Sequence, residues 1–210
     1  MAPNENELRE AMCKWGRSMF ERGLTSGSSG NLSARLPDGY LLTPTNSCLG
    51  YLDPGRLAKL DEAGRHISGD KPTKEIPLHL TYYEARPSAA AIVHLHSTYA
   101  TALSCRSDID PRNALKPVTP YVVMRVGRVP LLPYSTPGSD KVREPLLKAA
   151  PEHAAVLLAN HGPVVTGASL EAAVFAAEEL EEAARLAFLL EGRPHRVLTE
   201  ANLAELAGRA

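Results

Sequence analysis

Residues 74–96 read KEIPLHLTYYEARPSAAAIVHLH, and the candidate chemistry of the chain is arranged around this stretch. Its first part predicts a helix over residues 73–86, and its second part predicts a buried strand over residues 89–96. Because alternate side chains of a strand point to the same face, we expect His94 and His96 to project side by side. Two parallel imidazoles at a strand end favour a zinc-like ion, which then needs a third ligand.

We expect the third ligand to be His161. This histidine follows an apolar strand predicted over residues 154–159 and precedes a glycine, so it also lies at a strand end. A single His-X-His pair is as often incidental as functional, but three histidines at two strand ends favour one shared metal ion. The other histidines lack such settings and are interpreted as surface or helix residues: His66, His79, His153 and His195.

Glu75 stands at the start of the predicted helix. A glutamate in this position is usually a solvated residue that stabilises the helix N-terminus. Here it heads the segment that leads to His94 and His96, which makes it a candidate acid–base residue. A carboxylate close to a metal ion can move protons to and from a carbon whose charge the metal stabilises.

The composition is that of an ordinary globular protein. The chain has 210 residues, 44% of them hydrophobic, and a net charge of −1. The length suits one domain with a sizeable core, and the charge does not favour nucleic acid or an anionic membrane as a partner. The polar N-terminus does not resemble a signal peptide, and three scattered cysteines indicate a reducing compartment. We therefore expect a cytoplasmic protein.

The remaining patterns predict a single α/β domain over residues 1–210, with a central, mostly antiparallel β-sheet and helices packed on its faces. Turn signals separate two hairpins early in the chain, and apolar runs predict further strands near its middle and end. The further strands are expected over residues 31–36, 40–43, 57–60, 65–67, 121–126, 129–134 and 163–166. The further helices are expected over residues 5–23, 98–105, 142–149, 169–191 and 199–209.

Three separate segments offer small polar groups that could hold an anion. Loops and helix N-termini present backbone N–H groups, and hydroxyl groups or a lysine complete such sites. Each segment alone is a weak signal, because turns commonly use the same residues. Together with the histidines, they predict a site for an anionic ligand at Gly30, Asn31, Thr45, Asn46, Thr73 and Lys74.

With these residues assembled, the sequence resembles the class II aldolase/adducin family from about residue 6 to residue 192. The motifs that carry the resemblance occur in the family's order: SSGNLSAR, LLTPTNSCLG, GDKPTKE, VHLHSTYATALS and LANHGPVV. Within the family, GDKPTKE, VHLHSTYATALSC and TPYVVMRVGRVPLLPY most resemble the decarboxylases of 3-oxo-tetronate 4-phosphates.

The resemblance implies a Zn²⁺ ion held by His94, His96 and His161, although imidazoles also accept Mn²⁺, Co²⁺ or Fe²⁺. It implies that Glu75 is the acid–base residue and that phosphate is held by the six residues given above. It also implies a homotetramer with sites at the subunit interfaces. Tyr121 best matches a tyrosine that the family's aldolases bring to the site from a neighbouring subunit.

The expected reaction is decarboxylation of a 3-oxo-tetronate 4-phosphate to dihydroxyacetone phosphate and CO₂, through a metal-stabilised enediolate. A retro-aldolase acting on a sugar 1-phosphate is the main alternative, since it would use the same metal, glutamate and phosphate site. The aldolases carry two serines where this chain has Thr73 and Lys74, which implies a rebuilt phosphate pocket. The sequence has no tyrosine after Tyr134 to match the C-terminal tyrosine of the aldolases, and this difference weakens the aldolase alternative. A non-catalytic, adducin-like interaction domain is the remote alternative, because such a domain has no need to keep the three histidines and Glu75.

Overall fold

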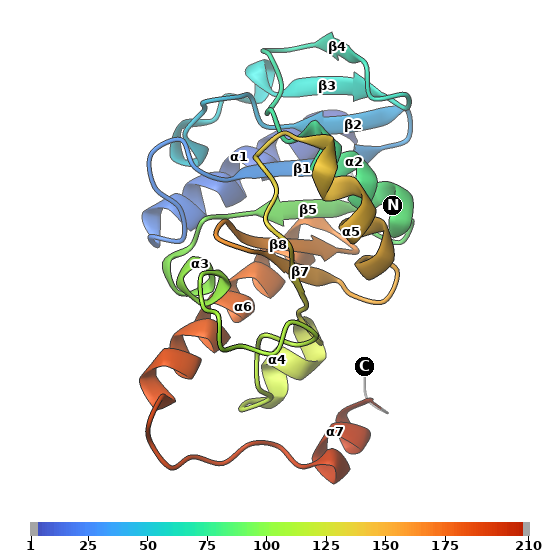
Figure 1. The fold of residues 1–210 in the computed structure, drawn as a ribbon. Helices are drawn as coiled ribbons and strands as arrows, with labels where there is room; N and C mark the ends of the chain where they lie inside the picture. The colour runs from blue at the N-terminus through green and yellow to red at the C-terminus, as the bar shows by residue number, and fades with distance from the viewer. Residues whose placement is uncertain (1–3, 208–210) are drawn as a thin grey trace.

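The computed structural model describes residues 4–207, and within this range eight strands form one sheet in the order β4-β3-β2-β1-β5-β8-β7-β6 (Figure 1). Neighbouring strands are antiparallel except for β6 and β7, which confirms the predicted mostly antiparallel sheet. The strands are β1 (Asn31–Leu36), β2 (Gly39–Leu42), β3 (Ala58–Asp61), β4 (His66–Ser68), β5 (Ala91–His94), β6 (Leu131–Leu132), β7 (Ala155–Leu158) and β8 (Gly162–Gly167).

Helices cover both faces of the sheet (Figure 1). The α-helices are α1 (Glu5–Glu21), α2 (Ile76–Ala85), α3 (Thr98–Ser104), α4 (Pro120–Arg125), α5 (Arg143–Ala149), α6 (Leu170–Leu190) and α7 (Glu200–Ala207). Three short 3-10 helices are η1 (Leu49–Tyr51), η2 (Pro54–Arg56) and η3 (Asp140–Val142). No helix in the described range is both long and apolar enough to cross a membrane.

The alternation of side chains along β5 divides the core into two layers. Val93 packs into the larger cluster with residues of α1 and α6, whereas Ile92 packs with residues of α2 and α5. His94 lies two residues after Ile92 and therefore points toward the layer formed by α2 and α5. This alternation places the imidazole on the side of the sheet from which α2 begins.

The expected strand over residues 121–126 is wrong, because these residues lie in α4. The β-branched run suggests a strand, but the side chain of Thr119 accepts the N–H of Val122 as an N-cap, and Pro120 occupies the first helical turn. Val122 and Val126 are buried four residues apart, on one helical face that joins the core beside α6. The strand expected over residues 129–134 is present only as the two residues of β6.

Smaller differences concern the ends of elements. The expected helix over 73–86 begins at Ile76, so Glu75 is the residue that caps α2 rather than part of its first turn. Strand β5 ends at His94, and His96 lies beyond it. The expected tail helix matches α7, although its last two expected residues lie outside the described range.

Candidate metal centre

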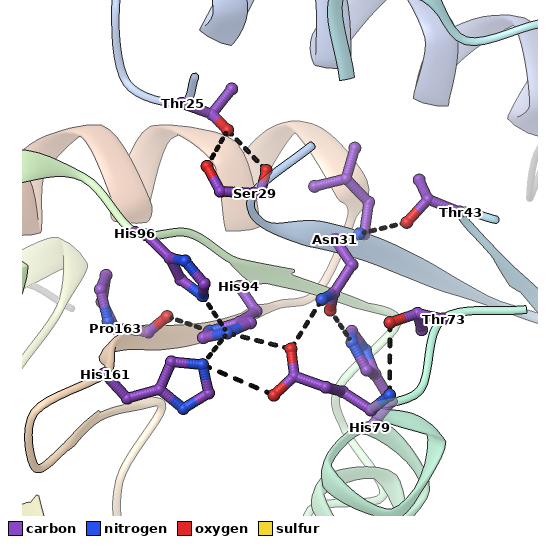
Figure 2. A network of polar contacts seen from close by, with 12 residues as sticks. Thr25, Ser29, Asn31, Thr43, Thr73, His79, His94, His96, His161 and Pro163 are labelled. Carbon is purple, nitrogen blue, oxygen red and sulfur yellow. Dashed lines mark hydrogen bonds and ion pairs between the residues drawn. The ribbon is translucent and has the colours of Figure 1, made fainter. Parts of the chain in front are cut away.

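His94 is held by the strands on both sides of it. It pairs with Asn31 of β1 and with Val164 of β8, and its side chain is fully buried. The ring donates its Nδ1–H to the backbone carbonyl of Pro163 at 2.8 Å (Figure 2). A hydrogen bond from one ring nitrogen fixes the ring and leaves the other nitrogen, Nε2, to face the site.

The three candidate ligands meet through their Nε2 atoms. The Nε2 atom of His94 lies 3.2 Å from that of His161 and 3.2 Å from that of His96 (Figure 2). Tetrahedral zinc–nitrogen bonds of about 2.05 Å would hold two ligand nitrogens about 3.3 Å apart. His96 is the most exposed of the three, which leaves one side of the cluster accessible to a ligand. The spacing therefore fits a divalent metal ion bound by three imidazoles.

Gly162 allows His161 to reach this cluster. Its φ is +150°, and a Cβ atom at this position would lie 2.5 Å from the carbonyl oxygen of Leu95. Any side chain at residue 162 would push the turn between β7 and β8 away from the end of β5. The glycine that follows His161 is thus a packing requirement of the site.

Glu75 completes the cluster from the start of α2. Its Oε2 atom lies 3.2 Å from Nε2 of His94, and its Oε1 atom lies 3.6 Å from Nε2 of His161. The amide of Asn31 donates to the same Oε2 at 2.8 Å. Burial by itself would raise the pKa of Glu75, but the charge and hydrogen bond of His94 outweigh burial and hold the pKa below its ordinary value. The carboxylate is therefore ionised in the resting protein.

The histidines differ in their affinity for a proton. Burial would lower the pKa of His94, but the Glu75 carboxylate outweighs burial and the pKa is raised. Burial, followed by the charge on His94, lowers the pKa of His96 and of His161 to about 4. These two rings carry bare lone pairs at neutral pH, which is the state that binds a metal ion.

His79 is a member of this site that the sequence analysis missed. Its fully buried ring contacts the Oδ1 atom of Asn31 through Nε2 (Figure 2). Its Nδ1 atom contacts the hydroxyl of Ser33. The signal was present in the sequence, because His79 stands four residues after Glu75 and residues four apart share a helix face. The partner Asn31 becomes apparent only from the register of β1 against β5.

Comparison with known proteins identifies the family of this chain. Residues 10–188 match the family described as the class II aldolase and adducin N-terminal domain. This chain belongs to the class II aldolase and adducin family. It is 55% identical over 205 residues to a 3-oxo-tetronate 4-phosphate decarboxylase of Pectobacterium atrosepticum, covering 97% of this chain and 94% of that protein.

More distant relatives include aldolases. An L-fuculose phosphate aldolase of Haemophilus influenzae is 33% identical over 182 residues, covering 85% of this chain and 81% of that protein. Among solved structures, YgbL of Klebsiella pneumoniae superposes with a TM-score of 0.95 at 52% identity, covering 98% of this chain and 100% of that one. That protein is described as an aldolase, epimerase or decarboxylase.

The segments predicted to hold phosphate in this class II aldolase family member lie partly side by side. The N–H of Thr45 donates to the carbonyl of Lys71, and the N–H of Thr73 donates to the carbonyl of Thr43. These bonds join the loop of Thr45 and Asn46 to the segment before Glu75. Asn46 has a φ of +56°, as befits a residue at the tip of a turn.

The other predicted phosphate residues have structural partners as well. Gly30 has a φ of +77°, and a Cβ atom there would lie 2.9 Å from the carbonyl oxygen of His94. Thr73 is buried, and its hydroxyl accepts the N–H of Glu75 at 3.3 Å. Asn31 uses its amide on Glu75 and His79, and Lys74 is exposed.

Residues 135–139 form a second segment that the sequence analysis missed. This loop and η3 line a small pocket whose other walls include Glu75 and His161. The backbone approaches α2 closely, because a Cβ atom at Gly138 would lie 2.8 Å from the carbonyl oxygen of Lys74. The small polar residues Ser135, Thr136 and Ser139 resemble those of the predicted loops and were the available signal.

Within the described residues, Tyr121 belongs neither to the metal cluster nor to the pocket beside Glu75. It is 59% exposed on α4, which packs against α6 and α7. Met124 is also exposed on this helix. The fold of a single chain therefore does not bring Tyr121 into the candidate site.

Proposed function

We propose that this chain is a metal-dependent decarboxylase that converts a 3-oxo-tetronate 4-phosphate to dihydroxyacetone phosphate and CO₂. The observation that carries the proposal is the set of three Nε2 atoms, two pairs of them 3.2 Å apart, beside an ionised and buried Glu75. The substrate is taken from relatives with this reaction in their name, which are up to 55% identical to the chain over nearly its whole length.

His94, His96 and His161 would hold the ion, which would take the place of the proton that Glu75 favours on His94. Three imidazoles with an accessible fourth position suit Zn²⁺. Mn²⁺, Co²⁺ and Fe²⁺ are chemically acceptable to the same ligands. When bound, the ion would stabilise the negative charge that develops on the substrate oxygens as the carbon–carbon bond breaks. His94 enters this role with its ring already fixed by the carbonyl of Pro163.

The reaction needs one proton and no oxidant. The bond between C1 and C2 of the substrate breaks, C1 leaves as CO₂, and the electron pair remains across C2 and C3. A proton then adds to C2 and gives dihydroxyacetone phosphate. We assign this proton transfer to the carboxylate of Glu75, directly or through water. Because Glu75 is ionised in the resting protein, it must first take that proton from solvent.

The C4 phosphate would bind at the segments that lead to the carboxylate. The exposed side chain of Lys74 and the adjacent turn of Thr45 and Asn46 offer a positive charge and polar groups on neighbouring backbone. Three further residues of the predicted phosphate site lie next to the metal cluster. The hydroxyl of Thr73 accepts the N–H of Glu75, the amide of Asn31 donates to Glu75, and Gly30 packs against the backbone of His94. Binding a remote phosphate would align C1 and C2 with the site.

We further propose a cytoplasmic homotetramer in which Tyr121 reaches the site of a neighbouring subunit. Tyr121 and Met124 form an exposed apolar surface on α4, which supports contact with another chain. The sequence has three cysteines, and within the described residues all three are free, which suits a reducing compartment.

The deciding experiment is product analysis. Purified, metal-loaded protein is incubated with a 3-oxo-tetronate 4-phosphate and, separately, with L-fuculose 1-phosphate. Release of CO₂ and dihydroxyacetone phosphate in equal amounts from the first substrate supports the decarboxylase. Release of an aldehyde from the second substrate, without CO₂ from the first, would assign the chain to the aldolases instead. Absence of both activities in metal-loaded protein would overturn the proposal.

A further inference from the structure

A chain of buried hydrogen bonds runs from the core to the carboxylate of Glu75. Nε2 of His79 contacts Oδ1 of Asn31 at 2.5 Å, and the amide of Asn31 donates to Glu75 at 2.8 Å. On the other side of the ring, Nδ1 of His79 contacts the hydroxyl of Ser33 at 2.7 Å. That hydroxyl in turn contacts the hydroxyl of Tyr83 at 2.9 Å.

The contact between Asn31 and Glu75 fixes the direction of the other bonds in this chain. The NH₂ group of Asn31 donates to a carboxyl oxygen of Glu75, so the amide oxygen of Asn31 faces His79. His79 then has to donate through Nε2–H. The ring stays neutral because burial lowers the pKa of His79 to about 3. Nδ1 of His79 therefore accepts from Ser33, and Ser33 accepts from Tyr83.

The position of Asn31 explains why its amide needs such support. Asn31 pairs with His94 across β1 and β5, so its side chain lies beside the metal cluster. A reversed amide would aim its oxygen at the carboxylate oxygen of Glu75, and two acceptors would repel. Donation from His79 is compatible with only one of the two amide orientations.

We propose that His79 is a positioning residue, which acts through Asn31 to hold the carboxylate of Glu75 against His94 and His161. This inference rests on the proposed function, because it makes the proton-transferring carboxylate the target of the chain. His79 itself contacts neither of the two metal-ligand histidines nor the pocket beside Glu75, within the contacts of the described residues. Its effect is thus on turnover and not on substrate or metal affinity.

The first test compares two substitutions of His79. His79→Phe keeps a ring but removes both nitrogens, and His79→Gln keeps a donor near the place of Nε2. We expect His79→Phe to lower kcat about 10- to 100-fold, with KM and metal content unchanged, and His79→Gln to recover most of that loss. Equal kcat values in the wild type and His79→Phe would overturn the proposal, as would equal losses in both variants.

Tyr82→Phe is the matched control. Tyr82 is fully buried in the same helix, and its hydroxyl donates to the carbonyl of His153, away from the site. We expect Tyr82→Phe to lose stability and keep kcat, so that lost stability and lost turnover are separated. A parallel loss of kcat in Tyr82→Phe would reduce the role of His79 to general support of the fold.

A double substitution tests whether His79 acts through Asn31. In the background of Asn31→Ala, His79→Phe has no amide left to orient, so we expect no further loss of kcat. Losses that multiply would show that the two residues act independently, and this result would contradict the proposal.

The ¹⁵N NMR spectrum of the His79 ring supplies a readout that needs neither metal nor activity. In metal-free wild-type protein we expect one neutral tautomer with its proton on Nε2, and loss of the downfield Nε2–H signal in Asn31→Ala. A proton on Nδ1 would overturn the proposed direction of the chain. If the protein shows the Nε2–H tautomer but has no decarboxylase activity, the proposed function is refuted and the hydrogen-bond chain through His79 still stands.

Discussion

Asn31 and His94 lie directly opposite each other in the antiparallel pairing of β1 and β5. Their side chains therefore leave the same face of the sheet, and the carboxylate of Glu75 lies within contact of both. A one-residue shift in this register would send the amide to the other face and leave Glu75 with His94 and His161 alone. The pairing of two strands thus determines the surroundings of the candidate acid–base residue.

Substitution of the carboxylate should separate chemistry from metal binding. We expect Glu75→Gln to keep the bound metal and the fold but to lower kcat by about 100-fold or more, because the amide cannot carry the proton. Metal analysis and CO₂ release are the measurements, and Glu84→Gln, on the exposed side of the same helix, is the control. Wild-type turnover in Glu75→Gln would remove the acid–base role.

Loss of one imidazole should empty the site. We expect His94→Ala to lose most of its bound metal and all measurable decarboxylation. Among the described contacts, only the Nε2 atom of His94 lies 3.2 Å from the Nε2 atoms of both other candidate ligands, so its loss removes the centre of the cluster. His66→Ala, at an exposed position of β4, is the matched control and should keep one metal ion per chain. A full complement of metal in His94→Ala would disprove the cluster as the binding site.

The phosphate assignment predicts an effect on KM. We expect Lys74→Ala to raise KM for the phosphorylated substrate about tenfold with little change in kcat, because a charge-assisted hydrogen bond to phosphate is lost. Lys148→Ala, at an exposed position of α5, should leave KM unchanged. An unaltered KM in Lys74→Ala would place this lysine outside the phosphate site.

The assignment of Tyr121 to a neighbouring site predicts complementation between subunits. Tyr121→Phe and Glu75→Gln should each have low activity, and hybrids assembled from both should regain part of it. In such hybrids some sites combine an intact Glu75 with an intact Tyr121 from another chain. Light scattering measures the expected tetramer. Hybrids no more active than the average of their parents would contradict a shared site.

Acid should destabilise the metal-free protein partly through His79. The folded pKa of about 3 lies below the value of about 6.5 for an exposed imidazole. Between these values the unfolded chain binds a proton that the folded protein does not, so stability falls as the pH falls. We expect His79→Gln to reduce the slope of unfolding free energy against pH by up to about 1.4 kcal/mol per unit in this window.

Denaturant unfolding in the presence of a chelator, repeated between pH 7 and pH 4, measures this slope. His66→Gln, at an exposed position of β4, is the control for replacing a histidine by glutamine. Identical slopes in the wild type and His79→Gln would mean that the ring of His79 takes up its proton in the folded protein.

Local patterns in the sequence were sufficient for most of the fold. The hairpin of β1 and β2 follows from Pro37-Asp38-Gly39, and α6 follows from its apolar stripe and the N-cap Ser169. Both features depend on residues that are close together in the chain. The convergence of His94 with His161, 67 residues apart, was predicted from the position of each histidine at a strand end.

The failures depend on residues that are far apart. The valines of α4 favour a strand until Val122 and Val126 pack beside α6, and this packing decides for a helix. His79 shares a helical face with Glu75, but its partner Asn31 comes from β1. The loop of residues 135–139 is near Glu75 because α2 and α5 pack against each other. The local signals, a spacing of four residues and a run of small polar residues, do not identify these partners.

The three imidazoles come from the sheet and its turns, whereas the carboxylate comes from the start of a helix laid across it. In the proposed mechanism, the metal ligands and the acid–base residue therefore belong to different layers of the fold. A substitution at residue 75 would change the proton transfer and leave the three histidines in place. The helical layer is thus where the proposed chemistry could change without loss of the metal site.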